Sequence, residues 1–101
     1  MSIGQGAIKV TFAYPSFGGG YADSSPRLTI DGIEQPVRAW GSHVLPVAAG
    51  PHTLRILVDT PGGDSFGLAE APVTVGLGDQ VAVDYRAPRF HGARGRIRVK
   101  R

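Results

Sequence analysis

The side chains best suited to chemistry are three histidines, His43, His52 and His91. They are nine and 39 residues apart, whereas the ligands of a zinc site come in closely spaced pairs, so this spacing does not predict a metal site. His52 follows a Gly-Pro turn, where we expect its ring to bond backbone groups. No Gly-x-Ser-x-Gly motif marks a nucleophilic serine, and the absence of cysteine excludes thiolate catalysis and disulfides. We therefore expect no enzyme, no metal and no cofactor.

Two glycine-rich segments resemble ligand loops but lack the residues that would complete them. The three glycines of residues 18–20 could hold a phosphate through backbone amides, yet no Lys-Ser/Thr pair follows them and Asp23 would repel the anion. Asp59 and Asp64 flank a second glycine pair and could bind calcium, but two acids without EF-hand spacing make a weak site. We interpret both segments as turns, with calcium as the alternative for the second.

Basic residues are concentrated at the C-terminal end of the chain. Residues 1–84 contain four basic and eight acidic residues, whereas residues 85–101 contain seven basic residues and no acidic residue. The basic set is Arg86, Arg89, Arg94, Arg96, Arg98, Lys100 and Arg101. Such a segment suits a polyanion, which could be a membrane surface, a nucleic acid or an acidic protein face. The alternative is a solubilising tail that lies on the acidic body.

Aromatic residues surround the first glycine run. Tyr14, Phe17 and Tyr21 flank residues 18–20, so we predict a recognition loop built on Phe17 and Tyr21. An aromatic cap over one end of the domain is the alternative. Trp40 is predicted to be a core anchor; the alternative is an exposed aromatic at a binding surface or homodimer patch, where it would belong to the recognition loop with Phe17 and Tyr21.

Alternation of apolar and polar residues predicts strands throughout the chain and no helix. The expected strands are residues 7–14, 27–30, 37–40, 43–47, 52–59, 65–75 and 80–85, with residues 95–100 as a basic eighth. Between the first two we expect a long loop over residues 16–26. The Asp31-Gly32 pair predicts a tight hairpin turn, because both residues tolerate a positive φ. Pro46 and Pro72 each predict a sheet edge, or a bulge at Pro72, because proline donates no ladder hydrogen bond.

The sequence has seven or eight short strands, with a turn signal about every 8–12 residues. This pattern predicts an all-β, antiparallel, immunoglobulin-like sandwich. We place this domain at residues 1–86 and treat residues 87–101 as a basic C-terminal tail or an added edge strand. The N-terminus has no basic region followed by an apolar signal core, and no apolar run is long enough to span a membrane. We therefore expect a cytoplasmic protein, with peripheral membrane association possible through the basic tail.

Several turn motifs give the chain a family resemblance. They are Leu-Thr-Ile-Asp-Gly at residues 28–32, Val-Ala-Ala-Gly-Pro-His-Thr-Leu at residues 47–54 and Val-Thr-Val-Gly-Leu-Gly-Asp at residues 73–79. This pattern resembles PEGA-like and immunoglobulin-like small β-sandwich modules, and it is similar to domains in uncharacterised actinobacterial proteins that sit beside a membrane segment. The resemblance spans residues 27–89 and implies a non-catalytic interaction domain of the cell envelope.

Together these observations predict a non-catalytic interaction module that binds a protein partner or assembles with itself. Its basic C-terminal segment would contact an anionic partner or surface. The alternatives are a small basic nucleic-acid-binding protein and a carbohydrate-binding module. No small-molecule substrate is expected.

Overall fold

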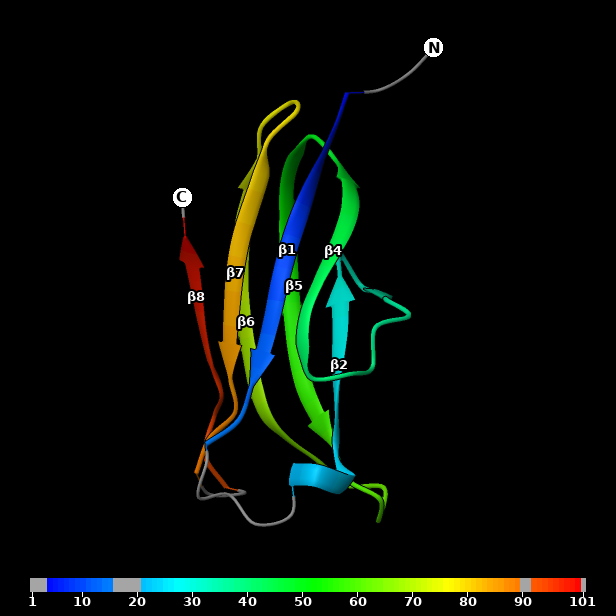
Figure 1. Cartoon of the computed structure of the whole chain (residues 1–101), viewed down its shortest axis with the longest axis vertical. Helices are drawn as coiled ribbons and strands as arrows, with labels where there is room; N and C mark the ends of the chain where they lie inside the picture. The colour runs from blue at the N-terminus through cyan, green and yellow to red at the C-terminus, as the bar shows by residue number, and fades with distance from the viewer. Residues whose placement is uncertain (1–3, 16–20, 90–91, 101) are drawn as a thin grey trace.

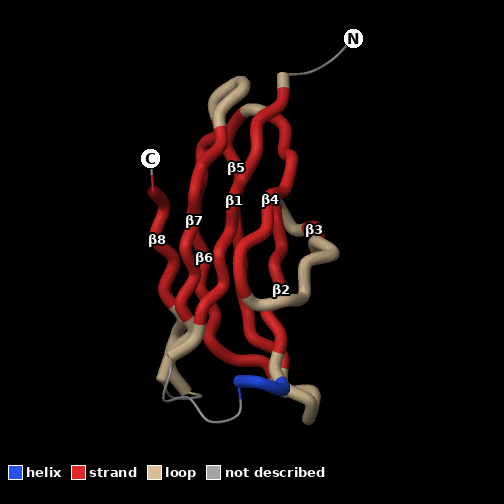
Figure 2. The backbone as a smooth tube through the Cα atoms, viewed as in Figure 1, coloured by secondary structure: helices blue, strands red, loops and turns tan. Residues whose placement is uncertain are grey.

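The computed structural model describes residues 4–15, 21–89 and 92–100 of the chain. In these ranges the elements are β1 (Gln5–Ala13), η1 (Tyr21–Asp23), β2 (Ser25–Ile30), β3 (Ile33–Glu34), β4 (Gly41–Ala48), β5 (Gly50–Asp59), β6 (Ser65–Val75), β7 (Gln80–Arg86) and β8 (Arg96–Lys100). Figures 1 and 2 show an elongated body made almost entirely of strands, which confirms the all-β sandwich. No helix in the described ranges is long and apolar enough to cross a membrane.

The strands form two four-stranded sheets. The first sheet has the order β4-β1-β7-β8 and the second has the order β3-β2-β5-β6. Most neighbours are antiparallel, but β1 and β7 run parallel, with Ile8 opposite Val81 and Phe12 opposite Tyr85. The first sheet is therefore mixed, whereas the described pairings of the second sheet are all antiparallel. β1 and β7 are far apart in the sequence. All four strands of the second sheet lie between them along the chain.

The core lies between the two sheets and follows the alternation of each strand. The first sheet contributes Ile8, Val10, Phe12, Val81, Val83 and Tyr85, and the second contributes Leu28, Ile30, Leu54, Ile56, Val58, Ala69, Val73 and Val75. Each of these side chains is less than a tenth exposed, so burial of apolar surface is the main stabilising term. The intervening residues point outward, and they form the outer face of each sheet.

Turn and edge predictions from the sequence are confirmed. Asp31 and Gly32 have φ values of 52° and 82°, which are the two positive values that a tight hairpin turn requires between β2 and β3. Pro46 lies in β4 and Pro72 in β6, and both strands are sheet edges. At an edge, the missing N–H of proline can face away from the sheet, so no hydrogen bond between strands is lost.

Two predictions, of one strand and of one loop, are wrong. The segment of residues 37–40 is not a strand, and β3 lies earlier, at Ile33–Glu34. Side chains hold the segment in place of a backbone ladder, since Trp40 Nε1 donates to the Ser24 carbonyl at 3.0 Å and Arg38 Nη2 donates to Asp59 Oδ2 at 3.0 Å. The loop expected over residues 16–26 ends earlier than predicted, because β2 begins at Ser25, and residues 16–20 lie outside the described residues.

His52 ties the β2–β3 turn to the β4–β5 turn. Its Nδ1 lies 2.6 Å from Asp31 Oδ2 and its Nε2 lies 2.6 Å from the Ala48 carbonyl oxygen. Thr53 N donates to the other carboxylate oxygen of Asp31 at 2.8 Å. The bond to Ala48, followed by the bond to Asp31, raises the pKa of His52. The bond from His52, followed by the bond from Thr53, lowers the pKa of Asp31.

This arrangement predicts a pH-dependent contribution to stability. The raised pKa of His52 means that its contribution is complete below the ordinary imidazole value of about 6.5 and is lost as the pH rises through the folded value. The lowered pKa of Asp31 means that its contribution is complete above about 3.9 and is lost as the pH falls through the folded value. We expect the melting temperature of the native chain to exceed that of His52→Gln most near pH 5.5, and by less near pH 8.5. A difference that does not change with pH would contradict this account.

Candidate cationic interface

The basic segment of the sequence contains the outermost strand of the first sheet. β8 pairs antiparallel with β7, placing Ile97 opposite Tyr85 and Val99 opposite Val83. Ile97 and Val99 are half-buried and pack against the core, whereas Arg96, Arg98 and Lys100 are exposed, as the alternation requires. Of the two alternatives for this segment, an added edge strand or a tail, residues 96–100 take the first.

Strand register arranges the outward side chains in rows across the first sheet. Arg86 is opposite Arg96, Asp84 is opposite Arg98, and Ala82 is opposite Lys100. Lys9 of β1 lies next to Ala82 and so enters the row that contains Lys100. Lys9 was not among the predicted contact residues, although its place between the inward-facing neighbours Ile8 and Val10 already set it on the outer face.

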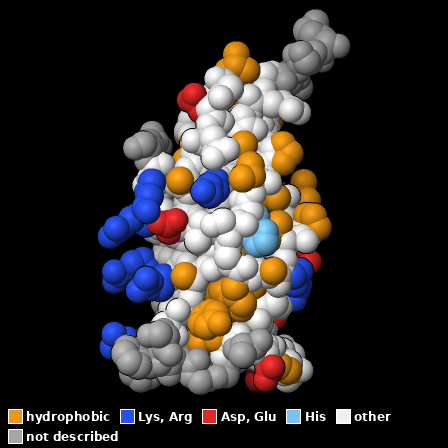
Figure 3. Space-filling model, in the orientation of Figure 1, with side chains coloured by type: hydrophobic (Ala, Val, Ile, Leu, Met, Phe, Trp, Pro, Cys, Tyr) orange, Lys and Arg blue, Asp and Glu red, His pale blue; other side chains and the backbone are white. Residues whose placement is uncertain are grey.

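Cations on this face greatly outnumber acids. Lys100 Nζ is 2.8 Å from Asp84 Oδ2. Within the described ranges Arg86, Arg89, Arg94, Arg96 and Arg98 form no ion pair and are all exposed. The basic segment therefore does not lie on acidic residues of the body, apart from the contact of Lys100. Figure 3 shows the lysine and arginine side chains gathered along one side of the molecule, over the β8 edge.

Arg27 and Arg38, by contrast, share the acidic partner Asp59. Asp59 Oδ2 lies 3.2 Å from Arg27 Nε in an ion pair and accepts a hydrogen bond from Arg38 Nη2 at 3.0 Å, and its Oδ1 accepts from Ser65 Oγ at 2.6 Å. Both carboxylate oxygens of Asp59 are thus engaged by protein groups. The Asp64 carbonyl accepts from Thr60 N at 2.9 Å, as in an ordinary turn. These contacts are those of an ordinary turn over residues 59–64.

A close contact fixes the start of β8 to the body. Tyr85 is 1% exposed and its hydroxyl donates to the Gly67 carbonyl at 2.6 Å. Gly95 N donates to the Leu68 carbonyl at 3.2 Å, so the chain entering β8 touches the second sheet. A Cβ at Gly95 would lie 2.5 Å from the Gly67 oxygen and 2.5 Å from a Tyr85 ring carbon. Burial raises the pKa of Tyr85 and keeps the phenol protonated as a donor.

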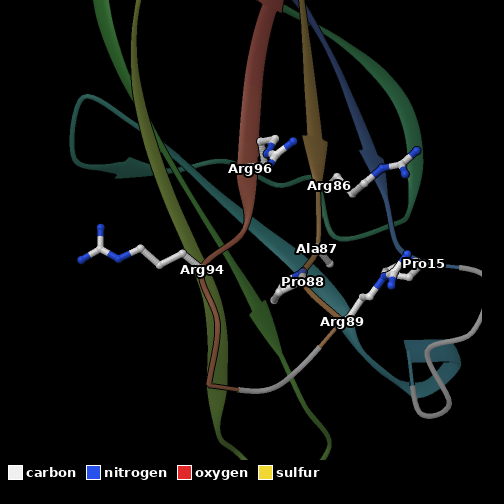
Figure 4. A pocket seen from close by; sticks show the side chains of 7 residues that line it. All are labelled: Pro15, Arg86, Ala87, Pro88, Arg89, Arg94 and Arg96. Atoms are coloured by element: carbon white, nitrogen blue, oxygen red, sulfur yellow. The ribbon is translucent and has the colours of Figure 1, made fainter.

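The cationic face is the outer face of the first sheet that carries Lys9, Arg86, Arg96, Arg98 and Lys100. Two hollows open at its arginine-rich end. The first has a volume of about 420 Å³ and is lined by Pro15, Arg86, Ala87, Pro88, Arg89, Arg94 and Arg96. The second has a volume of about 490 Å³ and is lined by Thr11, Ala13, Asp84, Tyr85, Arg86, Arg96 and Arg98. Figure 4 shows Arg96 extending toward β7, with Arg86 and Arg89 on the side of Pro15, and Arg94 extending the opposite way. Arg86 and Arg96 line both hollows.

The predicted aromatic recognition loop is not a set of exposed side chains. Tyr21 is 4% exposed, and its ring lies 5.3 Å from that of Tyr14, 5.8 Å from Trp40 and 5.6 Å from Phe66, measured between centroids. Trp40 is half-buried and packs against the core. Burial corrects the expectation that Tyr21 is presented to a partner, and the cluster matches the aromatic cap. Phe17 and Arg101 lie outside the described residues.

The histidines that the structure describes bond backbone carbonyls. His43 Nε2 lies 2.8 Å from the Ala39 oxygen, and His52 Nε2 lies 2.6 Å from the Ala48 oxygen. His91 is outside the described residues. In the parts of the chain that the structure describes, no three His, Cys, Asp or Glu side chains are grouped as metal ligands would be.

Comparison with known proteins gives no relative. No protein-family model, no curated protein and no solved structure matches the chain. Evidence about function therefore comes from the geometry of the cationic face.

Proposed function

We propose that this chain is a non-catalytic β-sandwich module that binds an acidic, extended segment of a protein partner along β8. The observation that carries the proposal is that β8 has a neighbour on one side only, while Arg96, Arg98 and Lys100 all point outward from it. An edge strand has backbone N–H and C=O groups free to pair with an added strand. The turn motifs that resemble PEGA-like modules agree with a role in interaction.

The alternation of β8 defines the partner. A strand added beside β8 would place its side chains opposite those of β8, because cross-strand neighbours share a face. Acidic residues at every second position would meet Arg96, Arg98 and Lys100, and apolar residues between them would extend the layer of Ile97 and Val99. The expected partner segment therefore alternates acidic and apolar residues.

The same rule disfavours self-assembly through β8. A second copy of β8 would bring arginine and lysine side chains opposite one another, and like charges in that position destabilise a strand pair. The other edge of the first sheet, β4, carries Pro46, which cannot donate to an added strand. Charge and backbone chemistry thus favour a different, acidic chain.

Nucleic acid is the second candidate for a cationic face. Proteins that bind single strands combine cations with aromatic side chains on which bases stack. Here the aromatic cluster includes Tyr21, whose buried ring offers no stacking surface, and the outward residues described in β7 and β8 include no aromatic side chain. This composition favours the acidic peptide.

The test uses a short synthetic peptide in which Glu alternates with Val and Ile, and a scrambled peptide of equal composition. We expect amide chemical-shift changes of the isotope-labelled protein to concentrate in β8 with the alternating peptide only, and the affinity to fall as salt is raised. Neutralising Arg98 and Lys100 to Gln should weaken binding about fivefold or more, because each exposed pair contributes up to about 1 kcal/mol.

The matched control is Arg55→Gln, which removes an exposed arginine from the outer face of the second sheet. It should leave the affinity unchanged. Equal binding of both peptides would contradict strand addition. A gel shift of an oligonucleotide at about 50 mM salt, without peptide binding, would replace the proposal by the nucleic-acid alternative.

A further inference from the structure

We propose that Arg86, Arg89 and Arg96 form a binding site for a phosphate monoester dianion in the 420 Å³ hollow at the lower end of β7 and β8. This inference goes beyond the proposed strand addition, since the site lies at the end of β8 and adds Arg86 and Arg89 to Arg96, the one residue that the two sites share. It depends on three features of the site: an unfavourable pair of cations, a lining without carboxylates and a fixed backbone.

The first feature is the pairing of Arg86 with Arg96. They are directly opposite each other in the β7–β8 ladder, where the Cβ atoms of such a pair are about 4.5–5.5 Å apart. Like charges at that separation destabilise a sheet, and neither guanidinium has an acidic partner among the described residues. An anion placed between them would convert a repulsive contact into two attractive ones.

The second feature is the composition of the hollow. Its lining contains four arginines and no aspartate or glutamate. The nearest acid of the neighbouring hollow, Asp84, is held by Lys100 at 2.8 Å and does not neutralise the arginines. A guanidinium presents its N–H groups as a planar fork that matches phosphate oxygens.

The third feature is the rigidity of the backbone between the arginines. Ala87 N donates to the Ala13 carbonyl at 2.9 Å, and the Tyr21 hydroxyl donates to the Pro88 carbonyl. Ala87 is 2% exposed, so the segment that joins Arg86 to Arg89 is anchored in the core. The contact of Gly95 with the Leu68 carbonyl fixes the residue before Arg96 in the same way. The three Cα atoms are thereby held in place before a ligand arrives.

A phosphate monoester fits this site better than a carboxylate. It carries close to two negative charges at pH 7 and three acceptor oxygens, whereas a carboxylate has one charge and two oxygens. Three guanidiniums can therefore offset the charge of the monoester and donate to each of its three terminal oxygens. The hollow opens outward, which leaves space for the group that is esterified to the phosphate.

The experiment measures two properties of the intact chain: its melting temperature, and its affinity from NMR chemical-shift titration. Inorganic phosphate and glycerol 3-phosphate are the ligands, and chloride at equal ionic strength is the control. We expect both phosphates to raise the melting temperature beyond the chloride control. The variant Arg86→Gln/Arg89→Gln should lose about tenfold or more in affinity, since each hydrogen bond between charged groups stabilises binding strongly. In chloride this variant should melt no lower than the native chain, because it removes the repulsion between Arg86 and Arg96.

A second arm separates the sources of the phosphate. Vesicles of neutral lipid with added phosphatidic acid present the same monoester on a membrane, and binding there that depends on Arg86 and Arg89 supports the same site. The control Arg55→Gln should leave every affinity unchanged. The proposal is overturned if phosphate acts no better than chloride, or if Arg86→Gln/Arg89→Gln binds as the native chain does. Loss of peptide binding in Arg98→Gln/Lys100→Gln with phosphate binding intact would show that the two sites are separate.

Discussion

Replacing Gly95 with valine is expected to detach β8 from the sandwich while the rest of the fold remains. The position has no room for a side chain, because a Cβ would lie 2.5 Å from the Gly67 carbonyl oxygen and 2.6 Å from the Tyr85 hydroxyl. One of these obstacles is backbone and the other is a buried ring, so neither moves easily. Overpacking of this kind costs about 1–3 kcal/mol. Here we expect β8 to release the strain by separating from β7.

The measurement is hydrogen exchange of the amides in β7 and β8. In the native chain those amides that bond across the β7–β8 ladder should be protected, and in Gly95→Val they should exchange at the rates of an open segment. The core amides of β2 and β5 should remain protected. Binding of the acidic peptide should be lost together with the ladder, because the partner strand needs an ordered edge to pair with.

The matched control is Gly92→Val, which lies three residues earlier in the same connection. A Cβ at Gly92 would meet no heavy atom within 4 Å. This variant should retain protected β8 amides and unchanged peptide binding. If Gly95→Val also kept both properties, β8 would not depend on the close contact with Tyr85.

Much of this fold can be predicted from local sequence because the strands alternate cleanly. The residues Ile8, Val10 and Phe12 mark an inward face by their spacing alone, and Asp31-Gly32 marks a turn by its tolerance of positive φ. The same rule distinguishes Ile97 and Val99 from the cations on either side of them. These are properties of neighbouring residues and need no knowledge of the rest of the chain.

Features that depend on distant contacts could not be predicted in this way. Residues 37–40 have the composition of a strand. Trp40 instead donates to the Ser24 carbonyl and Arg38 donates to Asp59, so side-chain hydrogen bonds hold the segment and not the backbone ladder that was expected. The parallel pairing of β1 with β7 is equally hidden, because no local pattern states which strand lies beside which. Placement of Lys9 in the row of Lys100 follows only from that pairing.

The candidate site shows the same division. Composition identifies the cluster of basic residues, and alternation identifies which of them share a face. Only the ladder reveals that Arg86 and Arg96 are opposite each other and that Asp84 is occupied by Lys100. Burial of Tyr21 also depends on distant partners, among them Phe66 and the carbonyl of Pro88.

Tyr85 lies where the core meets the start of β8, and we call this region the junction. It is 1% exposed, forms an edge-to-face contact with Phe12 at 6.2 Å between ring centroids, and donates to the Gly67 carbonyl. Its neighbours therefore come from both sheets and from the segment that enters β8.

Tyr85→Ala is therefore expected to be the most damaging single substitution. Loss of a large buried aromatic side chain costs about 3–5 kcal/mol, and for a domain of this size that lowers the melting temperature by about 15–30 °C. Tyr85→Phe keeps the ring and removes only the hydroxyl, so it should cost about 1–2 kcal/mol, the price of an unpaired carbonyl at Gly67.

Thermal and urea unfolding of the two variants separate packing from hydrogen bonding. Tyr14→Ala is the matched control, because Tyr14 is 40% exposed and its truncation leaves the contact between Tyr85 and Gly95 intact. It should destabilise the chain much less than Tyr85→Ala. Equal effects of the two alanine variants would mean that the aromatic cap, and not the junction at Tyr85, holds the sheets together. If Tyr85→Ala loses much stability and Tyr85→Phe loses little, most of the stabilisation at this position comes from packing of the ring. The same packing holds the backbone that carries Arg86, the next residue in β7, and its ladder partner Arg96.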